Sequence, residues 1–359
     1  MKIASIVGAR PQFIKCAPVS RELKKEHEEI LIHTGQHYDH GMSEVFFEEL
    51  SIPRPDYNLG IGSGTHGHQT GAMLGAIEDV FREEEPDVVL VYGDTNSTLA
   101  GALAAAKLHV PVAHVEAGLR SFDRRMPEEV NRVLTDHCSD LLFCPTATAV
   151  TNLAVEGIQE GVHLVGDVML DAMNHNRAIA EERSRILEDA DVRPGEYLVI
   201  TVHRPSNTDV RENMTSILSA LDEAGVPAVF PIHPRTRKCL GEYDLLEGVP
   251  ADVRVIEPLG YLDMLHLMAH AKKILTDSGG IQKEAYMLGV PCVTLRENTE
   301  WVETVEAGWN VLVGARREEI VDAIQEFDPV GEQMPCFGDG GASTLIREIL
   351  TEFQDTQTG

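Results

Sequence analysis

Short apolar segments alternate with amphipathic segments along the whole chain, and this alternation restricts the fold more than any other feature of the sequence. The apolar segments are rich in β-branched residues and favour buried strands, while the longer segments between them have the period of helices. Strands that alternate with helices form parallel sheets. The predicted strands are 2–7, 29–34, 87–92, 112–115, 141–144 and 163–165, followed by 197–202, 228–231, 253–256, 273–276 and 292–295.

These strands fall into two sets, so we predict two doubly wound (Rossmann-like) α/β domains with parallel sheets. A chain of 359 residues with 43% hydrophobic content can bury two such cores. We expect the hinge near Val168, with residues 1–168 and a C-terminal helix at 342–359 forming the N-terminal domain, and residues 169–341 the C-terminal domain. Because such sheets bind ligands beyond the carboxyl ends of their strands, we expect the domains to face each other across a cleft.

Composition excludes several classes of function. The formal net charge of −28 argues against nucleic acid as a partner. No segment approaches the roughly 20 apolar residues that span a bilayer, and the first residues indicate a strand rather than a signal peptide, so we expect a cytoplasmic protein without a membrane partner. The six cysteines lack Cys-x-x-Cys spacing, so neither a disulfide framework nor a structural zinc site is predicted.

The segment 276–285 indicates a loop that binds a diphosphate. It follows an apolar strand and leads into a helix, where Ser278, Gly279 and Gly280 would bring backbone N–H groups close to an anion. Glu284 lies four residues after Gly280, on the same helix face, where its carboxylate could accept hydrogen bonds from a ribose. The alternative is a strand-to-helix turn that needs glycine only for its backbone angles.

Charged residues follow three other strands of the first half. Arg10 and Lys15 come after the first strand, where both could reach an anion. Asp94 and Glu116 end the strands at 87–92 and 112–115, so neighbouring positions in the sheet, about 4.8 Å apart, would place two carboxylates side by side. Glu128 would add a third carboxylate, although a proline followed by two glutamates is also a common helix start.

Two histidines end strands of the second half, and each has an arginine nearby. His203 follows 197–202 and His233 follows 228–231, so both are candidates for the ligand site. His66 and His68 have no third ligand at suitable spacing, and we predict no metal. The glycine-rich run 60–64 does not follow a predicted strand, which argues against a bound dinucleotide, and we expect no cofactor.

Taken in order, these segments form a set of motifs: Gly8-Ala9-Arg10-Pro11 with Lys15, Gly35-Gln36-His37-Tyr38, Val91-Tyr92-Gly93-Asp94-Thr95, Val115-Glu116-Ala117-Gly118-Leu119-Arg120, Pro127-Glu128-Glu129-Val130-Asn131-Arg132, His203-Arg204, and Thr276-Asp277-Ser278-Gly279-Gly280-Ile281-Gln282-Lys283-Glu284-Ala285. The set resembles the non-hydrolysing UDP-N-acetylglucosamine 2-epimerases over nearly the whole chain. The resemblance implies a glycosyltransferase-B-like fold, a cytoplasmic homodimer, and reversible conversion of UDP-GlcNAc to UDP-ManNAc for cell-surface polysaccharides.

The resemblance also implies roles for individual residues. The implied catalytic residues are Asp94, Glu116, Glu128 and His203, and the implied substrate-binding residues are Arg10, Lys15, Ser278, Gly279, Gly280 and Glu284. His233 joins the second group on its position alone. The C2 hydrogen of the sugar is scarcely acidic, so the expected route breaks the anomeric bond to UDP first, gives a 2-acetamidoglucal, and returns a proton to the other face.

The chain departs from the family pattern at two places. Pro205 and Ser206 follow His203-Arg204 where many bacterial members have Arg-Glu, which puts their allosteric UDP-GlcNAc site in doubt for this chain. Trp301 stands where those members have a nucleotide-binding arginine, and Trp-Val-Glu also resembles the branch that acts on UDP-2,3-diacetamido-2,3-dideoxy-glucuronate. Further alternatives are a retaining glycosyltransferase of the same fold, a hydrolysing epimerase and a non-catalytic nucleotide-sugar sensor.

Overall fold

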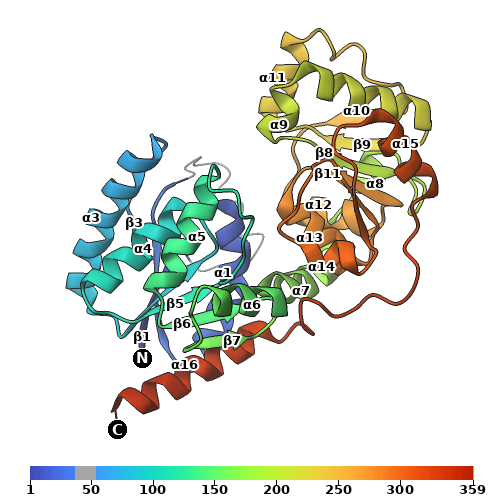
Figure 1. Cartoon of the computed structure of the whole chain (residues 1–359). Helices are drawn as coiled ribbons and strands as arrows, with labels where there is room; N and C mark the ends of the chain where they lie inside the picture. The colour runs from blue at the N-terminus through green and yellow to red at the C-terminus, as the bar shows by residue number, and fades with distance from the viewer. Residues whose placement is uncertain (37–53, 359) are drawn as a thin grey trace. The chain divides into compact units, whose positions relative to one another are not determined.

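The computed structural model describes residues 1–36 and 54–358, and these form two compact units (Figure 1). Unit 1 comprises residues 1–175 and 335–359, and unit 2 comprises 176–334. The boundaries predicted from the sequence are Val168 and Gly341, whereas the two units divide after His175 and before Pro335. His37 and Tyr38 of the motif that begins at Gly35 lie outside the described residues.

Unit 1 is built on a seven-stranded parallel sheet in the order β3-β2-β1-β4-β5-β6-β7. Its strands are β1 (Lys2–Val7), β2 (Glu28–His33), β3 (Tyr57–Asn58), β4 (Val88–Tyr92), β5 (Val112–Val115), β6 (Leu141–Cys144) and β7 (Val162–Leu164). Its helices are α1 (Arg10–Leu23), α3 (His66–Glu84), α4 (Asn96–Lys107), α5 (Pro127–Cys138), α6 (Ala147–Val155) and α16 (Ala342–Thr358), while α7 (Val168–Arg183) runs from unit 1 into unit 2.

Unit 2 is built on a six-stranded parallel sheet in the order β10-β9-β8-β11-β12-β13. Its strands are β8 (Leu198–Thr201), β9 (Ala228–Pro231), β10 (Val253–Ile256), β11 (Lys273–Thr276), β12 (Cys292–Thr294) and β13 (Asn310–Leu312). Its helices are α8 (Ile186–Asp189), α9 (Pro205–Thr208), α10 (Arg211–Ala224), α11 (Pro234–Glu242), α12 (Tyr261–Ala269), α13 (Gly279–Leu288), α14 (Val302–Glu306) and α15 (Arg317–Glu326).

Both faces of the unit 2 sheet are covered, which explains why its strands appear in the sequence as continuous apolar runs. Along β8, Leu198 and Ile200 belong to one hydrophobic cluster, whereas Val199 belongs to another. Successive side chains of a strand point to opposite faces, so a strand buried on both sides needs apolar residues at every position. The predicted α/β class with two parallel-sheet domains is therefore confirmed.

Two edge strands were not predicted. β3 has two residues and β13 has three. Each lies at an edge of its sheet and has a neighbouring strand on one side only. The residues of β3 are partly or fully exposed, so the strand lacks the apolar run that marks a central strand. The prediction that the run 60–64 does not follow a strand is wrong, because β3 ends at Asn58, two residues before the run. The error has the same origin, since β3 was not predicted.

The C-terminal helix α16 packs on unit 1 beside α1 and appears in red in Figure 1. Arg347 forms ion pairs with Glu26 and, at 3.7 Å, with Glu22, and His27 Nε2 lies 3.0 Å from Thr351 Oγ1. These contacts return the end of the chain to the domain that contains its start. Across the described part of the chain, every helix is too short or too polar to cross a membrane.

Candidate active site

The sheet of unit 1 brings Asp94 and Glu116 to the same edge. β4 and β5 are hydrogen-bonded neighbours with Tyr92 paired to Val115, and both carboxylates follow the ends of these strands. The sequence predicted that the two carboxylates lie side by side if these strands are neighbours, and β4 and β5 are neighbours. Asp94 is partly exposed and Glu116 is 9% exposed, so the two carboxylates have different environments.

Glu116 pairs with Lys15 of α1 and adopts a left-handed backbone conformation with φ of +72°. A glutamate rarely has positive φ, and such strain is maintained when surrounding contacts determine the conformation. Here the N–H groups of Glu116 and Ala117 both donate to the carbonyl oxygen of Phe143, at 3.1 Å. The strained turn directs the Glu116 carboxylate toward Lys15.

Gly93 leaves room for this ion pair. Its φ is +63°, and a Cβ atom at this position would lie 3.2 Å from both Glu116 Oε2 and Lys15 Nζ. A side chain at residue 93 would thus be strained and would also crowd the pair. The glycine before Asp94 is needed for the arrangement of its neighbours as well as for its own turn.

Asp94 pairs with Arg132 of α5. Arg132 also donates to Glu129 at 3.1 Å, and Glu129 accepts from the N–H groups of Ser121 and Phe122 at 2.9 Å. The sequence motif contained Arg132, but its pairing with Asp94 was not predicted, because the two residues come from different elements. The pair fixes the carboxylate of Asp94 and supplies a positive charge beside it.

Glu128 and Arg10 are less tightly defined. Glu128 lies in the first turn of α5 and is partly exposed, and no hydrogen bond of its carboxylate occurs within residues 1–36 and 54–358. An exposed acidic side chain at a helix N-terminus also fits the alternative interpretation. Arg10 is the first residue of α1, and its side chain lies outside the described residues.

A buried polar cluster lies beneath these strand ends. His114 of β5 donates from Nε2 to the carbonyl oxygen of Gly93 at 2.7 Å, while its Nδ1 lies 2.7 Å from Asp136 Oδ1. Arg120 donates to Asp136 Oδ2, also at 2.7 Å. Burial opposes ionisation of Asp136, but His114 and Arg120 outweigh it and lower the pKa of this carboxyl. The cluster supports the Gly93 turn, and sequence analysis missed it because His114 and Asp136 lie within regular elements.

In unit 2, Asp277 holds the loop that contains His203. β8 and β11 are neighbours with Thr201 paired to Thr276, so the residues after both strands meet at one edge. The fully buried Asp277 accepts from the N–H groups of His203 and Arg204 at 3.0 Å, and from Asn207 Nδ2 at 3.0 Å. The residue before Ser278 thus fixes the histidine loop and the start of α13 relative to each other.

His203 and His233 lie close together, with ring centroids 6.2 Å apart. Desolvation lowers the pKa of His203, and Arg204 and His233 act in the same direction against the opposing charge of Asp277. These effects favour the neutral form of the His203 ring, in which one ring nitrogen can donate a hydrogen bond to a diphosphate.

The start of α13 is closely packed. A Cβ atom at Gly279 would lie 2.0 Å from Glu300 Oε1, so a larger residue would displace that side chain. Ser278 is the N-cap residue and Gly280 is exposed, so N–H groups of the first turn are open to a ligand, while Glu284 is buried one turn further along. The predicted residues thus lie at the start of α13, and their binding of a diphosphate and a ribose stays a prediction.

Trp301 lies beside this helix and is 4% exposed. The ammonium group of Lys283 lies 4.4 Å from the centroid of the indole ring, in a cation–π contact. The tryptophan that replaces the family arginine therefore packs against a cation of its own chain.

The comparisons with known proteins agree with the motifs. The model of the family described as UDP-N-acetylglucosamine 2-epimerase matches residues 21–351. The chain belongs to this family. A protein from Methanococcus maripaludis described as a UDP-N-acetylglucosamine 2-epimerase homolog is 57% identical, with coverage of 98% of this chain and 99% of the relative. As a family member, the chain is an isomerase of the epimerase type.

Other relatives differ in their substrates. The UDP-2,3-diacetamido-2,3-dideoxy-D-glucuronate 2-epimerase of Pseudomonas aeruginosa is 50% identical, with coverage of 98% of this chain and all of the relative (100%). The crystal structure of Methanocaldococcus jannaschii UDP-GlcNAc 2-epimerase with UDP-GlcNAc and UDP is 48% identical, with a TM-score of 0.90 and coverage of 98% and 100%. The comparisons thus establish the family, whereas the names of similar relatives give two different UDP-sugar substrates.

Proposed function

We propose that the chain interconverts UDP-GlcNAc and UDP-ManNAc by eliminating UDP and adding it back, in the synthesis of precursors for cell-surface polysaccharides. The observation that carries the proposal is the pair of constrained carboxylates at one sheet edge, Glu116 beside Lys15 and Asp94 beside Arg132. A reaction that removes a proton from one face of a sugar and returns it to the other requires positioned acid and base groups.

Unit 2 would hold the nucleotide. The backbone N–H groups of Ser278, Gly279 and Gly280 would bind the diphosphate, and Glu284 the ribose, in keeping with the closely packed start of α13. His203 and His233 would donate hydrogen bonds to the departing phosphate. Interactions that strengthen as negative charge develops on the leaving group lower the barrier rather than merely tightening binding.

Unit 1 would act on the sugar. Once the bond from C1 to the UDP oxygen breaks, positive charge at C1 acidifies the C2 hydrogen, and a carboxylate among Asp94, Glu116 and Glu128 removes it. The product of this step is 2-acetamidoglucal. Protonation at the opposite face of C2 and return of the UDP oxygen to C1 complete the inversion, and Lys15 and Arg10 would stabilise the negative charge of the leaving group.

The test is incubation of the full-length protein with UDP-GlcNAc in D2O, followed by NMR. We expect deuterium at C2 of both intact UDP-GlcNAc and UDP-ManNAc. Release of free ManNAc would instead indicate hydrolysis, and loss of UDP that depends on an acceptor, with C2 still protonated, would indicate a glycosyltransferase. Binding without any exchange would indicate a sensor.

The second candidate substrate is UDP-2,3-diacetamido-2,3-dideoxy-glucuronate. It is supported by Trp301 and by the 50% identity to the Pseudomonas enzyme that acts on this sugar. Parallel assays with both sugars distinguish the candidates by the ratio of their kcat/KM values. The proposal also includes a cytoplasmic homodimer, and sedimentation velocity of the purified protein tests the assembly.

The Asp277→Asn variant should weaken UDP binding by about tenfold or more, since small displacements of positioning groups have large effects. Asparagine presents an NH2 group to donors that now share a carboxylate, which disturbs the loop of His203 and Arg204. The measurement is the dissociation constant for UDP by calorimetry. Asp209→Asn is the control, because Asp209 follows the same loop but is exposed. Equal affinities of the two variants would contradict the role of Asp277.

A further inference from the structure

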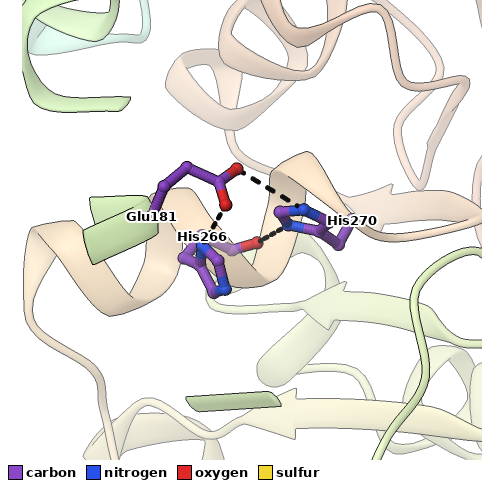
Figure 2. A group of neighbouring side chains, drawn as sticks. All are labelled: Glu181, His266 and His270. Carbon is purple, nitrogen blue, oxygen red and sulfur yellow. Dashed lines mark hydrogen bonds and ion pairs between the residues drawn. The ribbon is translucent and has the colours of Figure 1, made fainter. Parts of the chain in front are cut away.

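One glutamate and two histidines of unit 2 form a group of potential metal ligands (Figure 2). His270 follows the last residue of α12 and lies four residues after His266, a spacing that brings side chains to the same helix face. Glu181 comes from the last turn of α7. One ligand atom from each residue lies within 4.8 Å of the other two.

The hydrogen bond of His270 directs a nitrogen lone pair toward Glu181. Nδ1 of His270 lies 3.0 Å from the carbonyl oxygen of His266, and a carbonyl only accepts, so Nδ1 carries the hydrogen. In the neutral ring Nε2 is then unprotonated, and it lies 3.4 Å from Glu181 Oε1. A histidine whose other nitrogen donates to a backbone carbonyl is the usual arrangement around a protein-bound metal ion.

His266 provides an independent observation. The residue is 9% exposed, and its buried Nδ1 has no hydrogen-bond partner among the described residues. This nitrogen lies 3.8 Å from Glu181 Oε2. A buried polar atom without a partner is costly, so a ligand at this position would remove a penalty.

We propose that Glu181, His266 and His270 bind one zinc ion, with water completing the coordination. Two imidazoles and a carboxylate suit zinc, with bonds of about 2.0 to 2.2 Å that place ligand atoms of a tetrahedron roughly 3.3 to 3.5 Å apart. The histidine nitrogens lie 3.4 and 3.8 Å from the two oxygens of Glu181, and one ligand atom of each residue lies within 4.8 Å of the other two, so side-chain rotations would close the group around an ion. Glu181 is exposed, with 45% of its side chain accessible, so water can reach the ion.

This ion would link α7 to α12 within unit 2, and none of its ligands has a role in the proposed epimerisation. Sequence analysis predicted no metal because only His66 and His68 stood out. The signal was His-x-x-x-His at the end of a helix, whose third ligand comes from a helix much earlier in the chain.

The test uses the full-length protein after chelation and dialysis, titrated with Zn²⁺ by calorimetry and with Co²⁺ for its visible spectrum. We expect one strong equivalent per chain. His270→Gln and Glu181→Gln should each weaken zinc binding by at least tenfold, because even outer partners of metal ligands contribute about 10- to 100-fold. Zinc should raise the unfolding temperature of the wild type but not of these variants.

His137→Gln is the matched control. His137 lies 3.5 Å from Glu156 in an exposed pair without a second histidine, so its loss should leave zinc affinity unchanged. Absence of saturable zinc binding would overturn the proposal and would leave the group as a histidine–glutamate ion pair. Binding that His270→Gln and Glu181→Gln do not weaken would also overturn it, since the ion would then be bound elsewhere.

Discussion

The Glu116→Gln variant should lose about 10²- to 10⁴-fold in the rate of C2 exchange, the usual contribution of one positioned acid or base. Glutamine has nearly the shape of glutamate but cannot take up a proton. The carboxylate of Glu116 is buried and pairs with Lys15, and its strained backbone holds it in place, so the amide of glutamine would occupy its position without its function as an acid or base. The measurement is deuterium incorporation at C2 in D2O by NMR.

Affinity for UDP should change far less than the exchange rate in this variant, because the proposed contacts of Ser278, Gly279, Gly280 and Glu284 with the nucleotide belong to unit 2. Asp94→Asn should behave in the same way, with the added loss of its ion pair with Arg132. Glu78 is partly exposed and pairs with Arg82 on α3, away from the proposed catalytic residues, and Glu78→Gln should retain full exchange. Exchange near the wild-type rate in Glu116→Gln would rule out Glu116 as an acid or base.

The arrangement of the fold could be predicted from the sequence wherever burial left a clear pattern. Central strands such as β4 and β8 are buried on both faces, so each appears as a continuous apolar run. The edge strands β3 and β13 have few buried residues and gave no such signal. Strand order does not follow from apolar runs, and the neighbouring positions of β4 and β5 became known only from the sheet.

The candidate site could be predicted from the sequence only in part, namely for the residues that directly follow strands. Residues that directly follow strands, such as Asp94, Glu116 and His203, stand out because parallel strands end at one edge. Their partners do not stand out. Arg132 and Asp277 act through pairs between elements distant in sequence, and the backbone angle of Glu116 is set by contacts with Phe143. Such pairing depends on the folded arrangement and leaves no local pattern.

The second large effect concerns stability. Asp136→Asn should lower the free energy of unfolding by about 3 to 5 kcal/mol at pH 7, the usual cost of removing one partner from a buried ion pair. Asp136 is 1% exposed and is the common partner of His114 and Arg120, so its loss removes the buried charge that both contact and leaves Arg120 with Glu156 as its remaining ionic partner. Urea unfolding gives the measurement. The exposed pair of Arg82 and Glu78 provides the control, and Glu78→Gln should leave the urea midpoint unchanged.

The loss of unfolding free energy in Asp136→Asn should depend on pH. The direction of the pKa shift of Asp136 decides whether this loss grows or shrinks as the pH falls. The pKa of Asp136 is lower in the folded protein than in the unfolded chain, where an aspartate has a pKa of about 3.9. Its charge therefore stabilises the fold fully above that value, and this contribution is lost as the pH falls through the folded pKa. The difference in stability between wild type and Asp136→Asn should narrow progressively below about pH 4. A difference that stayed constant down to the acid-unfolding range would show that the variant acts through packing and not through the charge of Asp136.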